Sequence, residues 1–184
     1  MATIIADDAL ALQRLYHWEK TAPDRVALTQ PLGGGVVRDY TWREVLDQSR
    51  RMAAHLLGLG LQPGDRIAIL SKNTAHWLMS DFAIWLAGCV SVPLFPTLAP
   101  GTIRQILEHS ESRLLFVGKL DGWDHMKSGV PEGLPWTISS STEMQSVFGH
   151  PDRPFNGGLA PLCPRMNFSA RENPSGSGRV RSIR

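Results

Sequence analysis

The chain has 184 residues, 42% of them hydrophobic, which is enough for one sizeable core and excludes a disordered or fibrous protein. Its formal net charge of +2 is unevenly spread, because residues 156–184 carry five arginines and one glutamate, whereas residues 1–155 carry 14 basic and 16 acidic side chains. The basic excess belongs to the tail alone, and arginines without a folded platform give only non-specific attraction to nucleic acid.

No targeting segment is recognised in the sequence. Asp7 and Asp8 stand near the N-terminus, where a secretory signal needs basic residues. The longest nearly apolar run, residues 82–95, falls short of the roughly 20 residues that cross a bilayer. Cys89 and Cys163 lie far apart and fit no metal-ligand or redox spacing. We therefore expect a cytoplasmic protein.

The first elements in the chain are a surface helix and a hairpin. Residues 8–20 have apolar positions at helical spacing, with Asp8 as a plausible N-cap. Two short apolar runs follow at residues 26–29 and 36–40, separated by Pro31 and three glycines at 33–35. Because glycine adopts positive φ at little cost, this pattern predicts a β-hairpin.

The next helix is the clearest in the sequence. Thr41 precedes Glu44 by three residues, which is the spacing of a capping box. One apolar helical face follows, formed by Trp42, Val45, Leu46, Ser49, Met52, Ala53, Leu56 and Leu57. Gly58 and Gly60 then predict the end of this helix.

From residue 66 the chain alternates between strands and helices. Short apolar runs predict strands at 66–70, 90–94 and 114–117, with helices at about 74–87 and 100–110 between them. Weaker signals indicate a strand at 136–138 and a short helix at 142–147. This order predicts an α/β fold with a partial doubly wound parallel sheet, flanking helices and right-handed crossovers.

The composition changes near residue 155. Glycine, proline and serine make up 11 of the 29 residues from 156 to 184, and no helical or strand period remains. We therefore divide the chain into a domain at 1–155 and a disordered basic tail at 156–184. The tail could be a linker toward a further domain or the product of a shifted reading frame, and the abrupt change favours the second.

The sequence gives little support for a glycine-rich phosphate-binding loop. The turn after the first predicted strand, residues 71–74, has no glycine, which disfavours dinucleotide binding. Lys72 and the helix start at Thr74 could hold an anion, but a solvated lysine is the favoured interpretation. Residues 174–179 resemble a phosphate loop only superficially, and a flexible end is favoured.

Other catalytic patterns are also missing from the sequence. The six histidines fit no metal spacing, and no serine lies in a nucleophile elbow. Asp81 stands in an apolar stretch, where it either faces water, the favoured alternative, or has a partner. Core packing is favoured for four aromatic residues, Trp42, Trp77, Phe82 and Trp85. We assign no catalytic, cofactor-binding or metal-binding residue.

Three ordered motifs carry a family resemblance. They are YTWREV at residues 40–45, GLQPGDRIAILSKN at 60–73 and AGCVSVPL at 87–94. Together they resemble the N-terminal subdomain of the adenylate-forming acyl-activating enzymes, the AMP-binding family, over about residues 10–148. The continuations at 95–98 and 106–110 look most like long-chain fatty acid CoA ligases.

The resemblance implies a two-step reaction. A carboxylate attacks the α-phosphate of Mg-ATP to form an acyl-adenylate, and the thiol of coenzyme A then displaces AMP. The family uses a Ser/Thr/Gly-rich loop ending in Pro-Lys-Gly, later acidic and aromatic motifs and a lysine on a C-terminal domain, and none of these motifs occurs in this sequence. We therefore expect an N-terminal fragment of an ATP-dependent long-chain acyl-CoA ligase that binds no cofactor and is inactive alone.

Two further expectations concern partners. A partial sheet would leave one face open to water, through which the chain could self-associate. In the intact family a peripheral membrane location is possible, with a fatty acid as substrate. The alternative to a ligase fragment is a non-catalytic interaction module that pairs with a ligase or with its remaining domains.

Overall fold

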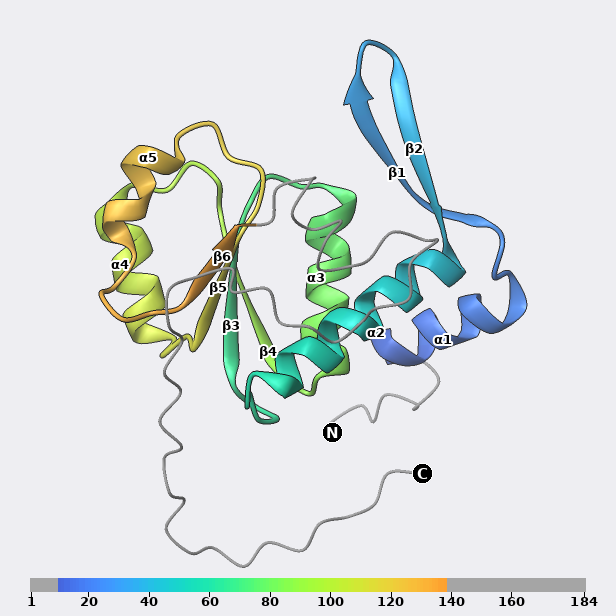
Figure 1. Ribbon diagram of the computed structural model, residues 1–184, viewed down its shortest axis with the longest axis horizontal. Helices are drawn as coiled ribbons and strands as arrows, with labels where there is room; N and C mark the ends of the chain where they lie inside the picture. Colours follow the sequence, from blue (N-terminus) through green and yellow to red (C-terminus); the bar gives the residue numbers. More distant parts are fainter. Residues whose placement is uncertain (1–9, 139–184) are drawn as a thin grey trace, which may run out of the picture.

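The computed structural model describes residues 10–138, which form a β-hairpin and a parallel sheet with helices on both faces (Figure 1). The elements are α1 (Ala11–Thr21), β1 (Val26–Gly33), β2 (Val36–Thr41), α2 (Trp42–Gly58), β3 (Arg66–Leu70), α3 (Ala75–Leu86), β4 (Val90–Leu94), α4 (Pro100–His109), β5 (Leu114–Val117), α5 (Trp123–Met126), η2 (Lys127–Gly129) and β6 (Trp136–Ile138). The predicted helix at 142–147 and the tail at 156–184 lie outside the described residues.

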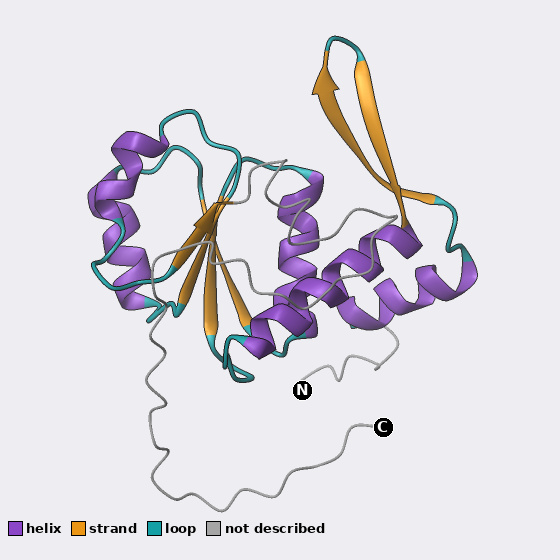
Figure 2. Ribbon diagram, in the orientation of Figure 1, coloured by secondary structure: helices purple, strands orange, loops and turns teal. Residues whose placement is uncertain are grey.

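The main sheet has the strand order β4-β3-β5-β6, and every neighbouring pair is parallel (Figure 2). The chain moves from β3 to β4 through α3 and then returns past β3 to β5 through α4. The two crossovers run in opposite directions along the sheet, and their helices, α3 and α4, cover opposite faces. The two crossovers therefore have the same hand, as the right-handed rule requires. The predicted α/β fold with a parallel sheet is confirmed.

Each face of the sheet carries its own apolar core, because successive strand side chains point to opposite sides. Ile67, Ile69, Leu114 and Phe116 pack with α2 and α3. Ala68, Leu70, Leu115 and Val117 pack with α4 and α5 on the other face. These eight side chains are at most 3% exposed. Both faces of β3 and β5 are therefore covered, which corrects the expectation of an open sheet face for these two strands, whereas self-association stays a prediction.

Helix α2 begins as the sequence predicts. The Thr41 side chain accepts a hydrogen bond from the Glu44 backbone N–H at 3.3 Å, and the Glu44 carboxylate accepts one from the Thr41 N–H at 2.7 Å. Six of the eight predicted face residues are buried, namely Val45, Leu46, Ser49, Met52, Ala53 and Leu56. Leu57 is 47% exposed, which corrects its assignment, because it lies one residue beyond the stripe and thus about 100° around the helix.

The hairpin is longer than predicted and extends away from the body (Figure 1). Strand β1 continues through Pro31 to Gly33, with Pro31 opposite Val37. A two-stranded ribbon accommodates this proline because each strand has one side without a ladder partner. Gly34 and Gly35 make the reversal with positive φ. Leu32, Val36 and Val37 are more than half exposed near this tip.

Two helices also differ from the sequence prediction. Helix α1 begins at Ala11, with Leu10 in the N-cap position and no side-chain cap, so the predicted start at Asp8 is wrong. Helix α5 has four residues and was not predicted, since one turn is too short to show a period. It closes the α4 face through Met126, which is 5% exposed.

Candidate functional site

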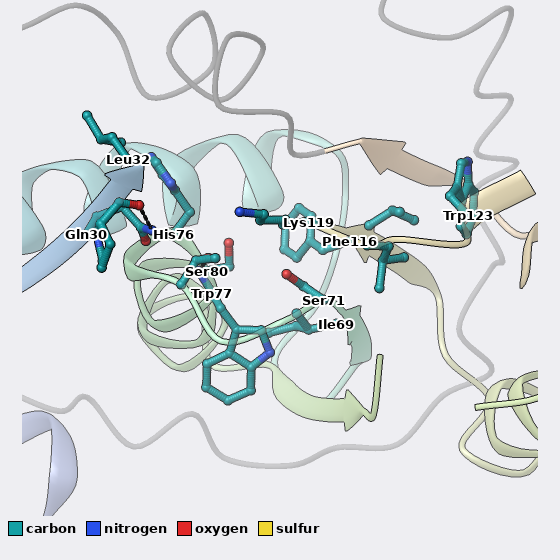
Figure 3. A pocket seen from close by; sticks show the side chains of 15 residues that line it. Gln30, Leu32, Ile69, Ser71, His76, Trp77, Ser80, Phe116, Lys119 and Trp123 are labelled. Atoms are coloured by element: carbon teal, nitrogen blue, oxygen red, sulfur yellow. Dashed lines mark hydrogen bonds between the residues drawn. The ribbon is translucent and has the colours of Figure 1, made fainter. Parts of the chain in front are cut away.

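A cavity of about 500 Å³ lies at the carboxyl ends of β3 and β5 (Figure 3). Its walls come from β1 of the hairpin, the first turns of α3, and the loop that follows β5. The chain leaves β3 and β5 toward opposite sides of the sheet, so a crevice forms at this topological switch point. Ligands of open α/β sheets bind in such crevices, which makes this cavity the candidate site.

The two strand ends are held together by a close backbone approach. The Gly118 N–H donates to the Leu70 carbonyl at 2.9 Å, and the Lys72 N–H donates to the Lys119 carbonyl at 2.9 Å. A Cβ on Gly118 would lie 2.1 Å from the Ser71 Oγ. Glycine at position 118 is therefore required if both loops are to form the floor of the cavity.

The N-terminus of α3 is used internally by the fold. Thr74 Oγ1 accepts a hydrogen bond from the Trp77 N–H at 3.0 Å, and Gln30 Oε1 accepts one from the Ala75 N–H at 2.8 Å. Lys72 forms an ion pair with Asp121. The structure thus does not bring Lys72 and Thr74 together as an anion site, and Lys72 is paired rather than simply solvated.

Histidine 76 stands beside the cavity and next to the hairpin. Its Nε2 lies 3.5 Å from the Tyr40 hydroxyl, and the two rings meet edge to face. Burial lowers the pKa of His76, and the nearby Arg38 charge lowers it further. Burial raises the pKa of Tyr40. Both side chains are therefore neutral at pH 7, and neither adds charge to the cavity.

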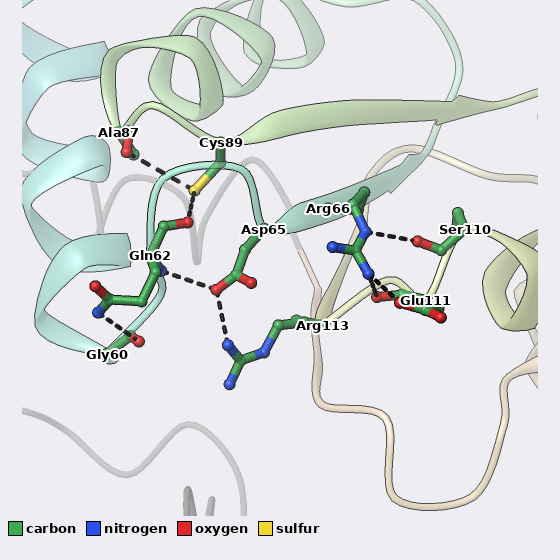
Figure 4. Close-up of polar contacts among 9 residues, drawn as sticks. All are labelled: Gly60, Gln62, Asp65, Arg66, Ala87, Cys89, Ser110, Glu111 and Arg113. Carbon is green, nitrogen blue, oxygen red and sulfur yellow. Dashed lines mark hydrogen bonds and ion pairs between the residues drawn. The ribbon is translucent and has the colours of Figure 1, made fainter. Parts of the chain in front are cut away.

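Three polar residues from the first half of the motif at residues 60–73, Gln62, Asp65 and Arg66, lie at the opposite edge of the sheet (Figure 4). Asp65 accepts hydrogen bonds from the Gln62 N–H and from Arg113, both at 2.8 Å. Arg66 donates to the Ser110 carbonyl at 2.8 Å and pairs with Glu111. These contacts tie the turn before β3 to the turn before β5, so this part of the motif is structural.

Cys89 lies in the same region and is buried with a free thiol. Its Sγ lies 3.5 Å from the Gln62 carbonyl oxygen. Burial raises the pKa of the Cys89 thiol, and the charge of Asp65 raises it further. A thiol held protonated is a poor nucleophile.

Asp81 does not face water, which corrects the favoured prediction. The residue is 8% exposed in α3, and burial raises the pKa of its carboxyl, while the Ser91 hydroxyl lowers it in part. The Ser91 Oγ is itself buried, and its contact with Asp81 falls short of a well-formed hydrogen bond in distance or angle. The hydroxyl therefore offsets only some of the cost of burying this carboxylate.

Three of the four aromatic residues, Trp42, Trp77 and Phe82, pack against the apolar cores as predicted, whereas Trp85 belongs to none of these clusters in the described part of the chain. Trp42 and Phe82 contact the cluster beneath the hairpin, Trp77 contacts the α2–α3 core, and Trp85 contacts Phe82. Trp77 also lines the cavity. Core packing and a place in the cavity wall are compatible in one indole, because its ring has two faces.

Sequence reasoning missed the cavity and its polar residues Gln30, Ser80 and Lys119. One signal could have located it. Ser71 and Gly118 each follow a predicted strand, and the carboxyl ends of parallel strands meet at one edge of a sheet. Gln30 gives no such signal, since only the tertiary fold brings the hairpin there.

Residues 10–138 contain no group of three side chains that could hold a metal ion. In the same range, no helix is long and apolar enough to cross a membrane.

Solved structures share this fold. CmiS6 is 28% identical with a TM-score of 0.61, and the match covers 74% of this chain and 32% of that one. VinN is 23% identical with a TM-score of 0.62, covering 73% and 33%.

Curated relatives match by sequence. The long-chain-fatty-acid–CoA ligase FadD15 of Mycobacterium tuberculosis is 38% identical over 102 residues, which cover 55% of this chain but only 17% of that protein. The model of the AMP-binding enzyme family matches residues 15–149, more than half of the chain. The resemblance recognised from the three motifs is therefore confirmed, and the chain belongs to the AMP-binding enzyme family.

Proposed function

We propose that this chain supplies the N-terminal scaffold of an ATP-dependent long-chain acyl-CoA ligase, which activates a fatty acid through an acyl-adenylate. The observation that carries the proposal is the 38% identity to a long-chain ligase over 102 residues. The comparisons favour this function over a separate interaction module, because the matched relatives are ligases.

The proposal includes the inactivity of the chain alone. A magnesium-bound triphosphate needs several cationic and amide donors for its charge and oxygen ligands for the metal. At the candidate site Lys72 is paired with Asp121, and the first N–H groups of α3 are capped by Thr74 and Gln30. The residues present at the cavity therefore do not fit Mg-ATP, and we derive no chemical step there.

We also propose a cytoplasmic location. The support is the free thiol of Cys89, which is protected only by burial, and a reducing compartment keeps such thiols unpaired.

A pyrophosphate-release assay tests the inactivity. The purified 184-residue chain is given palmitate, ATP, magnesium and coenzyme A, with an intact long-chain ligase as positive control. We expect the background rate of pyrophosphate release. Turnover that saturates with both ATP and palmitate would refute the proposal that the chain alone is inactive.

A chimera tests the scaffold role. Residues 10–138 of this chain replace the corresponding segment of FadD15, and palmitate activation is measured. We expect activity within about tenfold of the parent ligase, because these residues would support the catalytic parts without contacting the reacting atoms. The matched control carries Gly118→Ala, which disturbs the floor of the cavity and should lose folded protein. A folded but inactive chimera would count against the scaffold role.

A further inference from the structure

The hairpin of β1 and β2 projects from the body of the molecule and forms a sheet of its own (Figure 1). Within residues 10–138, the backbone groups of residues 26–40 make no backbone hydrogen bond outside the ladder between these two strands. A ribbon of two strands is marginally stable in water. Unpaired N–H and C=O groups along a strand edge are a template for a further strand.

The edge of β1 is blocked against such pairing. Pro31 lies within this strand and has no N–H, and its carbonyl already accepts a hydrogen bond from the Gln30 side chain at 2.9 Å. Proline is one of the devices that keep an edge strand from pairing with another chain. A further strand therefore has no continuous set of partners along β1.

The edge of β2 is open. This strand contains no proline, and its residues Val36 and Val37 are 58% and 54% exposed. Val37 lies opposite Pro31 in the hairpin. Because Pro31 has no N–H to donate, this pair fits the position of an antiparallel ladder where both residues direct their backbone groups away from each other. The N–H and C=O of Val37 therefore point toward the unpaired edge.

The charges on β2 restrict how this edge can pair with a second copy of itself. In an antiparallel pair related by a two-fold axis, the residue at the axis lies opposite its own copy. A register centred on Arg38 would oppose two arginines, and one centred on Asp39 would oppose two aspartates. Like charges directly opposite each other are destabilising. Centred on Val37, the pair opposes two valines, while Arg38 faces Val36 of the copy and Asp39 faces Gly35.

We propose that two copies of this chain associate through the open edge of β2, with Val37 at the two-fold axis. The Val37 N–H of each copy donates to the Val37 carbonyl of the other, so the two hairpins form one antiparallel sheet in the order β1-β2-β2-β1. Because each hairpin offers one open edge, the contact is self-complementary and closes at two copies. The proposal is independent of ligase function, since it concerns association of this chain and requires no turnover.

Analytical ultracentrifugation of the full 184-residue chain tests the association. Sedimentation equilibrium over a wide range of protein concentration gives the stoichiometry and the dissociation constant. We expect a reversible equilibrium between monomer and dimer, without larger species.

Two substitutions at Val37 should break the dimer. Val37→Lys places like charges opposite each other at the axis and should raise the dissociation constant at least about tenfold. Val37→Pro removes the N–H that would bond to the second copy and should abolish dimerisation, while the hairpin accommodates it as it accommodates Pro31 on the facing strand. The matched control is Val26→Lys, at a valine that is 47% exposed at the base of the hairpin, and it should leave the dissociation constant unchanged.

A disulfide tests the register. Opposed residues of a hydrogen-bonded antiparallel pair have Cα atoms about 5.5 Å apart, a separation that a disulfide can span. The background is Cys163→Ser, in which the remaining native thiol is the buried Cys89. Under mild oxidation, Val37→Cys should form a covalent dimer on a non-reducing gel, whereas Val26→Cys should stay monomeric.

Four results would overturn the proposal. One is a wild-type chain that stays monomeric at every concentration, and another is association into species larger than a dimer. The third is an equal effect of Val37→Lys and Val26→Lys on the dissociation constant, which would place the contact elsewhere. The fourth is equal cross-linking of the two cysteine variants. Thermal melting of each variant identifies any that fails to fold, and Val37→Lys decides the case if Val37→Pro does not fold.

Discussion

The two edges of the parallel sheet differ in how completely their polar groups are used. At the amino edge, Asp65, Arg66 and Arg113 all pair with groups in neighbouring turns (Figure 4). At the carboxyl edge, a cavity remains, and Ser80 and Lys119 are among the residues that line it. The first half of the motif at residues 60–73 therefore stabilises the amino edge, whereas its last residues lie at the edge that holds the cavity.

The largest expected loss of stability comes from a substitution at Gly118, at the carboxyl edge of the sheet. Gly118→Ala would place a Cβ 2.1 Å from the Ser71 Oγ and should lower the free energy of unfolding by about 3 kcal/mol, as overpacking does. Urea unfolding measures this. Ser71→Gly in the same chain removes the clashing atoms and should restore part of the loss.

Gly101→Ala serves as the matched control for that substitution. This glycine lies in α4, where an added Cβ meets nothing within 4 Å, so alanine should leave the helix unchanged or slightly more stable. A loss below about 1 kcal/mol for Gly118→Ala would mean that the two loops can separate without strain.

The amino edge gives the next largest effect. Asp65→Ala removes the acceptor for the Gln62 N–H and for Arg113, and should cost about 2 kcal/mol of unfolding free energy, the range of charge-assisted hydrogen bonds. Asp121→Ala is the control, because its pair with Lys72 is exposed and should contribute less than about 1 kcal/mol. Equal losses in the two variants would contradict the structural role given to the amino edge.

Sequence reasoning predicted the fold better than the site, for physical reasons. The bounds of β3, β4 and β5 follow from short apolar runs between turn residues, and the start of α2 follows from Thr41 and Glu44. These signals are local. The site depends on distant segments, since Gln30 reaches α3 only through the hairpin, and Lys119 and Ser80 line one cavity only because the sheet brings their loop and helix together.

Asp81 illustrates the same limit within one helix. The apolar neighbours of Asp81 in the sequence indicated that burying its carboxylate would be costly. Whether the carboxylate is buried or exposed depends on how α3 packs against β4, which the sequence does not show. Ser80 and Asp81 are adjacent in α3, yet one lines the cavity and the other is buried near Ser91. A helix turns by about 100° per residue, so neighbours in sequence enter different environments.

Asp81→Asn should raise the free energy of unfolding, by less than Asp65→Ala lowers it. Burial raises the pKa of this carboxyl, so the folded state binds a proton more tightly than the unfolded chain, and ionisation at neutral pH is destabilising. Removing the charge should increase the unfolding free energy at pH 7 by about 1 kcal/mol. The gain should shrink as the pH approaches 3.8, where the unfolded carboxyl also becomes protonated. A loss of stability at pH 7 would mean that the carboxylate has a stronger partner than Ser91.

The smallest effect is the pH dependence contributed by His76 at the carboxyl edge. Because burial and Arg38 lower its pKa, the unfolded chain binds a proton below pH 6.5 more readily than the folded chain does. Stability should therefore be full above pH 6.5 and fall as the pH is lowered through that value. His55 in α2 shifts in the same direction through burial, so His76→Gln should remove only part of this fall in urea unfolding at pH 7.5 and pH 5. The exposed His125 provides the comparison: if His125→Gln removed as much of the fall as His76→Gln, the pH response would not originate in the packing of the hairpin against α3.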